Sequence, residues 1–307
     1  MDNEWIEIME SPTKLEKRKR TASQKCCLFS SIALVLIVIT LAIAIPLAIL
    51  LPKGNRVVKY TGPGASTSII VPLYIYPGAH DWDPLYEAVE KYPSKNFTVI
   101  INPKSGPGGT VLPNPDFYPA ISKLNAFSNV QTVGYVPTGY GARNMSEILK
   151  DIATYSGWNK AKPSISMHGI FFDEVISDWS PDAGTFMKTI NQAVKNATGL
   201  LGARTTVHNP GNIPDARYED NNTDITVVFE SSFDDYQNKK TALAALPDAR
   251  QRYAYMVHSS SLGKTSLHNF INDLSQHADW LFITNSGANY YEKFGSNWKD
   301  FVSAIPV

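Results

Sequence analysis

The chain has 307 residues, of which 43% are hydrophobic and 18% are charged, and this globular composition excludes a wholly disordered or fibrous protein. Its 28 Lys and Arg residues balance 28 Asp and Glu residues, so no basic excess neutralises a phosphate backbone and no nucleic-acid partner is expected. The two cysteines, Cys26 and Cys27, are adjacent, which excludes a disulfide framework or thiolate metal site in the rest of the chain.

Residues 26–51 form an uncharged stretch that is long enough to cross a membrane. The stretch has 26 residues, whereas about 20 suffice to span the hydrocarbon core. Pro46 is tolerated in such a span because neighbouring groups satisfy the freed carbonyl. A cleaved signal peptide is the alternative, but its apolar region is usually about 7 to 15 residues long. The sequence therefore predicts an uncleaved anchor over 26–51.

Basic residues flank this stretch unequally, and their distribution predicts the orientation. Lysines and arginines are more numerous before it (Lys14, Lys17, Arg18, Lys19, Arg20, Lys25) than after it (Lys53, Arg56, Lys59). The positive-inside rule then predicts a cytoplasmic tail over 1–25 and a lumenal or extracellular C-terminal part, as in a single-pass type II membrane protein. N-glycosylation sequons agree with this orientation, at Asn96, Asn144, Asn196 and Asn221.

After a polar, Gly- and Pro-containing linker predicted over 52–67, the pattern becomes regular. Short apolar runs alternate with longer amphipathic stretches, which is typical of β-α units and a parallel sheet. Strands are predicted at 68–76, 97–102, 130–136, 165–173, 204–209, 225–230, 253–258 and 280–285. Helices are predicted at 84–91, 115–127, 145–158, 181–196, 235–246, 265–277 and 291–304. The gap between the fifth and sixth strands lacks a clear helix.

Eight strands with intervening helices fit an α/β fold of the (β/α)8 TIM barrel type over 68–307, better than an open doubly wound sheet. No G-x-G-x-x-G motif follows the first strand, which removes the main reason to expect a dinucleotide cofactor. The six histidines show no compact ligand spacing, so neither a metal nor another cofactor is expected. The domain outside the membrane is expected to be monomeric.

Polar residues close most of the predicted strands, at the barrel end where β-α loops hold the chemistry of such folds. We expect these residues to face one cleft and to contact a substrate; they are Tyr74, Tyr76, Asn102, Tyr135, Asn209, His258 and Asn285, together with Trp82 on a following loop. Aromatic faces suit stacking on sugar rings, although most buried aromatic residues only fill a core.

Three acids stand at two of these strand ends. Asp173 and Glu174 directly follow Ile-Phe-Phe, and Glu230 follows Val-Val-Phe. Neighbours on an extended strand alternate faces, so one acid of the first pair is central and the other flanks the site or turns in on the loop. Paired carboxylates are the groups a glycosidase needs, one to protonate the leaving oxygen and one to attack carbon or activate water. The alternatives are a helix N-cap or a salt bridge to Arg143, Arg204 or Lys162.

Two further motifs have structural interpretations. Asp81-Trp-Asp83 matches the D-x-D of metal-dependent glycosyltransferases, but Asp83 directly precedes Pro84 and a helical run, which favours a helix cap. The glycine-rich segment 105–109 is predicted to be a turn-rich loop over the cleft.

Several ordered segments together resemble a known family: VPLYIYP (71–77), IINPKSGPGG (100–109), VGYVPT (133–138), GIFFDE (169–174) and FE (229–230). They are similar to the spherulin-4-like proteins of fungi and slime moulds, glycoside hydrolase family 135, from about residue 69 to the C-terminus. The resemblance implies a (β/α)8 barrel that cleaves α-1,4-linked N-acetylgalactosamine within galactosaminogalactan, a secreted, adhesive fungal exopolysaccharide. It also implies that Asp173, Glu174 and Glu230 are the active-site acids.

Our hypothesis casts Asp173 as nucleophile, Glu230 as general acid/base and Glu174 as a supporting carboxylate. The separation of the carboxyl groups distinguishes a retaining mechanism, at about 5 to 5.5 Å, from an inverting one, at about 6.5 to 9.5 Å. A non-catalytic carbohydrate-binding protein of the cell wall or biofilm remains an alternative, since fold does not dictate function. A glycosidase for deacetylated galactosamine is another.

Overall fold

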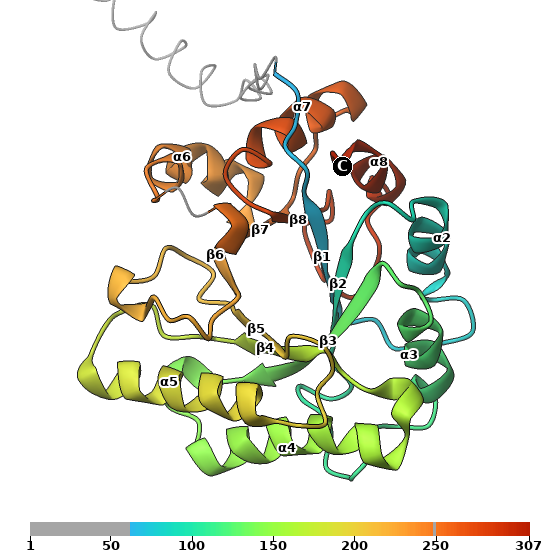
Figure 1. Cartoon of the computed structure of the whole chain (residues 1–307). Helices are drawn as coiled ribbons and strands as arrows, with labels where there is room; N and C mark the ends of the chain where they lie inside the picture. Colours follow the sequence, from blue (N-terminus) through green and yellow to red (C-terminus); the bar gives the residue numbers. More distant parts are fainter. Residues whose placement is uncertain (1–61, 248–249) are drawn as a thin grey trace, which may run out of the picture. The chain divides into compact units, whose positions relative to one another are not determined.

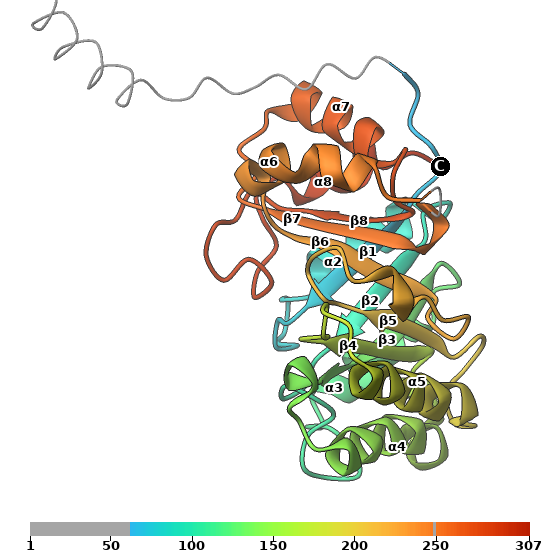
Figure 2. The same ribbon diagram turned by 90° about the vertical axis from the view of Figure 1, so that its left-hand side faces the viewer.

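The computed structural model describes residues 62–247 and 250–307, which belong to one compact unit. Parallel strands close into a barrel in sequence order, and helices cover its outer surface (Figures 1 and 2). The strands are β1 (Ser68–Leu73), β2 (Phe97–Ile101), β3 (Val130–Pro137), β4 (Gly169–Asp173), β5 (Thr205–His208), β6 (Ile225–Ser232), β7 (Tyr253–His258) and β8 (Trp280–Ile283). The helices are α2 (Asp83–Lys91), α3 (Phe117–Asn125), α4 (Met145–Ala161), α5 (Pro181–Asn196), α6 (Phe233–Ala244), α7 (Lys264–Leu274) and α8 (Trp298–Ala304). The predicted (β/α)8 barrel is confirmed.

Two predicted boundaries need the largest corrections, and a further prediction agrees with the structure. The fourth strand begins at Gly169 rather than at residue 165, because Pro163–Ile165 is a 3-10 turn. The last helix begins at Trp298 rather than at residue 291, so 284–297 is a long loop between β8 and α8. Between β5 and β6 the chain forms only a 3-10 turn, Ala216–Tyr218, as the missing helical pattern predicted.

The N-terminal predictions fall largely outside the described residues. The tail over 1–25, the anchor over 26–51 and most of the linker belong to residues 1–61, and they stay predictions. The described end of that linker is held against the barrel, since Thr67 N donates to Pro306 O and Ala65 N to Ser275 Oγ. Within 62–247 and 250–307, no helix is long and apolar enough to cross a membrane.

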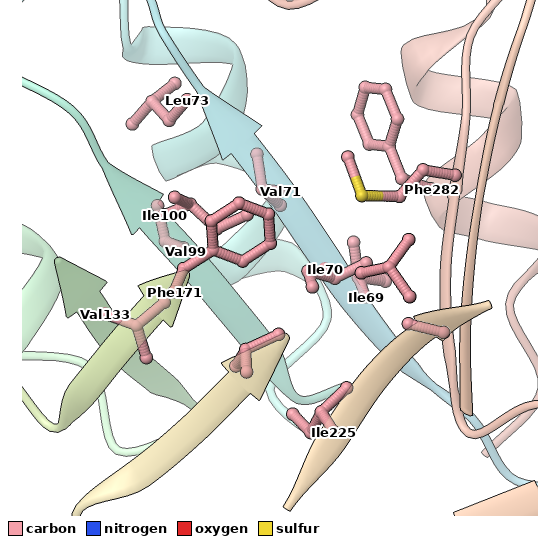
Figure 3. Close-up of a cluster of buried hydrophobic side chains, with 14 of the residues drawn as sticks. Ile69, Ile70, Val71, Leu73, Val99, Ile100, Val133, Phe171, Ile225 and Phe282 are labelled. Carbon is pink, nitrogen blue, oxygen red and sulfur yellow. The ribbon is translucent and has the colours of Figure 1, made fainter. Parts of the chain in front are cut away.

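The barrel interior is filled by branched and aromatic side chains from the strands, some of which Figure 3 shows. Phe171 of β4 is fully buried, and its ring stacks on Tyr135 of β3 with centroids 6.1 Å apart. The β3–β4 register pairs Tyr135 with Phe171 and Pro137 with Asp173. Because side chains alternate along a strand, Asp173 lies on the same inner face as Phe171, one step nearer the mouth of the barrel.

A β-bulge in β6 aims Glu230 into the same mouth. Thr226 and Val228 line a cavity outside the barrel, and Phe229 packs on Tyr236 of α6 with ring centroids 5.7 Å apart. These contacts show that Val228 and Phe229 both face outward. Two neighbouring residues can do so because the register of β6 against β7 shifts between Val227 and Phe229. Without the extra residue, regular alternation would turn Glu230 outward with Val228.

Candidate active site

Asp173 and Glu230 are joined by one amide group at the mouth of the barrel. Asn209, directly after β5, donates from Nδ2 to Asp173 Oδ1 over 2.8 Å and to Glu230 Oε2 over 2.5 Å. Because both bonds start at one nitrogen, the two oxygens lie at most about 5.3 Å apart, the sum of 2.8 and 2.5 Å. Asn209, predicted to contact substrate, thus positions the two carboxylates.

Two tyrosine hydroxyls complete the hydrogen bonding of this pair. Tyr135 donates to Asp173 Oδ2 over 2.7 Å, and Tyr291 donates to Glu230 Oε1 over 2.6 Å. Burial raises the pKa of Glu230; hydrogen bonds from Tyr291 and Asn209 oppose this rise, and the charge of Asp173 adds to it. Glu230 is therefore held as a half-buried acid whose carboxyl group has an increased affinity for a proton.

Glu174 is close to this pair but is not hydrogen-bonded to it. It has a left-handed backbone, with φ of 54°, and its carbonyl oxygen accepts from Tyr140 N and Thr138 Oγ1, each over 2.7 Å. A non-glycine residue in this region is strained, and such residues cluster at functional sites. The Glu174 charge raises the pKa of Tyr135, after burial and the effects of Asp173. The charge of Glu174 thus acts on Tyr135, the hydrogen-bond donor to Asp173.

The salt-bridge alternative for these acids is wrong. Arg143 pairs with Asp151 over 2.7 Å, and Arg204 donates to the carbonyl of Lys195. The Lys162 ammonium lies over the ring of Tyr118. Within the described parts of the chain, no lysine or arginine forms a salt bridge with Asp173, Glu174 or Glu230.

Aromatic residues from the end of β1, from β7 and from the β8–α8 loop form two contacting clusters near this end of the barrel, which include the predicted substrate contacts Tyr74 and His258. Tyr74 packs edge-on against Tyr135 and Tyr291, with centroids 5.4 and 5.5 Å away. The His258 ring stacks on Tyr290 at 4.2 Å, with 6° between the planes. The Tyr290 ring also packs edge-on against Tyr291 at 4.5 Å. Burial raises the pKa of Tyr290, and the charges of Glu230 and Asp173 add to this effect.

The remaining predicted substrate contacts lie at the rim of the barrel or form hydrogen bonds within the protein. Tyr76 is 50% exposed and donates to Asp116 at the rim. Asn102 Oδ1 accepts from Gly106 N over 3.1 Å, and Asn285 Nδ2 donates to Ser296 Oγ over 2.6 Å, so both brace loops. Trp82 is wrong as a stacking platform: it is only 2% exposed, and its Nε1 donates to the carbonyl of Ile75.

The Asp81-Trp-Asp83 motif and the glycine-rich segment 105–109 also differ from what the sequence predicts. Asp83 is the first residue of α2 and pairs with His80 over 2.7 Å, but no side chain caps the helix through a hydrogen bond. The glycine-rich loop leans on α4 instead of the cleft, because Gly106 lies against Asp151 and Gly108 and Gly109 line a hollow with residues of α4.

Tyr291 is the site residue that the sequence pattern missed, because 291–304 was predicted to be one helix. The signal against that helix was present: Gly295, Ser296 and Asn297 interrupt it, and such clusters mark loops or helix starts. In Figure 2 the long loop between β8 and α8 reaches out from one end of the barrel.

All four sequons lie on exposed side chains of the described structure. Asn221 is in the loop between β5 and β6, whereas Asn144 caps α4 by accepting from Ser146 N over 2.9 Å.

We predict that the chain made in a eukaryotic secretory host loses mass on treatment with a peptide N-glycosidase. Asn221→Gln should remove one glycan, and because that side chain is exposed it should leave folding unchanged. A mass that matches the bare chain before treatment would contradict both the glycosylation and the predicted orientation.

A closed (β/α)8 barrel with two bridged carboxylates at its mouth defines the class, a barrel of the glycoside hydrolase kind. The family model described as spherulation-specific family 4 matches residues 68–305. The chain belongs to this spherulin-4 family, which confirms the resemblance found in its sequence.

Two relatives show how far the similarity extends. Spherulin-4 of Physarum polycephalum is 32% identical over 205 residues, which are 64% of this chain and 57% of that protein. The chain thus spans little more than half of this relative. The crystal structure of Aspergillus clavatus Sph3 in complex with GalNAc is 37% identical, with a TM-score of 0.76, and the match covers 80% of this chain and 98% of that one.

Proposed function

We propose that this protein is an endo-acting glycoside hydrolase that cleaves α-1,4-linked N-acetylgalactosamine within a secreted exopolysaccharide such as galactosaminogalactan. The observation that carries the proposal is the carboxylate pair, bridged by Asn209 at the mouth of the barrel. The similarity to a protein solved with bound GalNAc supports the choice of sugar. The tyrosines around the pair offer faces on which sugar rings can stack.

The raised pKa of Glu230 suits a general acid, which must be protonated when substrate arrives. In the first step its proton passes to the glycosidic oxygen as the C1–O bond breaks, and an oxygen of Asp173 bonds to C1. In the second step Glu230 takes a proton from water, the water oxygen attacks C1 and the bond to Asp173 breaks. Glu174 contributes its charge beside Tyr135.

The carboxylate spacing supports a retaining mechanism. The bridged oxygens are at most about 5.3 Å apart, from bonds of 2.8 and 2.5 Å, which is shorter than the separation of about 6.5 to 9.5 Å between the carboxyl groups of inverting enzymes. We predict that the first product carries the α-anomer, as measured by proton NMR before mutarotation. Initial release of the β-anomer would contradict this geometry.

The activity is tested with the full-length chain and a purified polysaccharide that contains α-1,4-linked N-acetylgalactosamine. Mass spectrometry should detect internal N-acetylhexosamine oligomers, and a fully deacetylated sample of the same polymer should yield none. Release from the deacetylated polymer alone would favour the galactosamine hydrolase. Retention of the polymer without release would favour a carbohydrate-binding protein.

The proposal includes a type II anchor over residues 26–51 and a lumenal or extracellular barrel. Its support is the length of the apolar stretch and the excess of basic residues before it. A barrel held in this way would meet a polysaccharide as that polymer leaves the cell.

A further inference from the structure

Tyr291 contacts Glu230 from a different part of the chain than Asp173 and Asn209. It lies in the loop between β8 and α8, and its hydroxyl donates to Glu230 Oε1 over 2.6 Å. Its backbone is fixed as well, since its carbonyl oxygen accepts from Tyr74 N over 3.2 Å. The ring packs edge-on against Tyr74, Phe282 and Tyr290, with centroids 4.5 to 5.7 Å away. Tyr291 is thus held in place independently of the carboxylate.

The two partners of Glu230 differ in chemistry. The Asn209 amide nitrogen can only donate, so it pairs with Oε2 when that oxygen accepts. A tyrosine hydroxyl can donate to a carboxylate and can also accept from a carboxylic acid. By exchanging its donor and acceptor roles, Tyr291 can therefore stay paired with Oε1 in both protonation states of Glu230.

We propose that Tyr291 is a positioning residue for catalysis, which holds Glu230 for proton transfer and favours its ionised form over its protonated form. The inference rests on the proposed function, in which Glu230 gains and loses a proton in each cycle. A hydroxyl that donates to a carboxylate makes a charge-assisted bond, roughly twice as strong as a neutral one. Tyr291 thereby opposes the effect of burial and keeps proton exchange possible at Glu230.

Other titratable groups also face Glu230 and need to be separated from Tyr291. They are Asp173 of β4, Tyr74 after β1, Tyr135 of β3 and Tyr290 of the β8–α8 loop. Burial raises the pKa of each tyrosine, so these three are neutral while Glu230 titrates. Asp173 is the charged neighbour, and Tyr291→Phe leaves its hydrogen bonds in place.

The test is the pH dependence of kcat for Tyr291→Phe in the full-length chain. As the general acid, Glu230 limits activity on the alkaline side, because the enzyme loses the required proton above the Glu230 pKa. Removal of a donor to the carboxylate raises that pKa, so the alkaline limb should move up by about one pH unit. We expect kcat to fall about tenfold or more with little change in KM, because Tyr291 contacts the acid rather than the sugar.

Tyr290→Phe is the matched control. It removes a hydroxyl from the neighbouring ring, which has no hydrogen bond to either carboxylate. Its alkaline limb should coincide with that of the parent, whatever happens to KM. An unmoved alkaline limb in Tyr291→Phe, with a changed melting temperature or KM, would overturn the proposal and leave Tyr291 a purely structural residue.

Carbon-13 NMR of glutamate-labelled protein separates this inference from the proposed function, because it needs no substrate. The Glu230 resonance, assigned by its loss in Glu230→Gln, should titrate at higher pH in Tyr291→Phe than in the parent. If the protein lacks hydrolase activity, the proposed function is refuted. A higher titration pH of Glu230 in Tyr291→Phe would then still support the role of Tyr291 in the protonation of Glu230. Equal titration in the two proteins would refute the inference even if the hydrolase is active.

Discussion

Glu230→Gln and Asp173→Asn should each reduce the release of N-acetylhexosamine oligomers by about a thousandfold or more. Each amide keeps the size of the carboxyl group and an acceptor oxygen, so the barrel and most of its hydrogen bonds stay in place. Glutamine cannot protonate the leaving oxygen, and general acid catalysis contributes about 10² to 10⁴ in rate. Asparagine cannot form the covalent intermediate of a retaining enzyme. The measurement is initial oligomer release by mass spectrometry, over a range of enzyme concentrations.

The two variants separate the two roles when the leaving group is changed. An oligosaccharide with an aryl leaving group needs little protonation, so Glu230→Gln should recover most of its cleavage rate on that substrate. Asp173→Asn should stay inactive on both substrates, because the bond to C1 is still missing. Recovery by Asp173→Asn instead would exchange the two assignments.

Asp234→Asn is the control for loss of an acid at this end of the barrel. Asp234 lies in the first turn of α6, four residues after Glu230, and is exposed. Its amide variant should keep full activity, because it removes only a favourable charge at a helix N-terminus, worth about 0.3–1 kcal/mol of stability. Full activity of Glu230→Gln or Asp173→Asn would refute the proposed mechanism. Polymer binding by both inactive variants would show that they still fold.

The sequence predicted the barrel and Asp173 because both depend on local patterns. Each strand is a short apolar run, and the carboxyl end of a parallel strand is recognisable from the polar residue that closes the run. Asp173 follows Ile-Phe-Phe without irregularity, so its place at the mouth comes directly from the end of β4. The missing helix between β5 and β6 was predictable in the same way, because the intervening segment lacks helical periodicity.

The direction of Glu230 and the role of Tyr291 could not be predicted in this way. The inward position of Glu230 depends on the extra residue in β6, and a bulge is defined by the register with β7 rather than by the letters of β6. Tyr291 reaches Glu230 across a sequence separation of 61 residues, through a loop whose path follows from packing on β1. Asn209 was found at the right strand end, but its bridge to two carboxylates is a tertiary contact.

Phe171→Ala should lower the free energy of unfolding of the barrel by about 3–5 kcal/mol, the usual cost of truncating a buried phenylalanine. Phe171 is fully buried within the cluster of Figure 3, so the small side chain leaves a cavity that the closed ring of strands cannot collapse to fill. A domain of this size loses roughly 2–4 °C of melting temperature per kcal/mol, so we expect a drop of about 6–20 °C. Denaturant titration and calorimetry measure both quantities, and Val111→Ala, at a 73% exposed position, is the control with a change within about 0.5 kcal/mol.

The same substitution tests whether the core supports the active site. The Phe171 ring stacks on Tyr135, whose hydroxyl donates to Asp173. Loss of the Phe171 ring therefore removes the stacking contact that supports the Tyr135 ring. Phe171→Leu keeps most of the volume and should cost less than about 1.5 kcal/mol, which leaves the protein folded for kinetic measurement. Its kcat should still fall, because leucine cannot hold the Tyr135 ring in its stacked orientation and the Asp173 oxygen loses its fixed direction of attack. A stable Phe171→Leu with the kcat of the parent would show that Tyr135 is positioned by Tyr74 and the backbone of β3 alone.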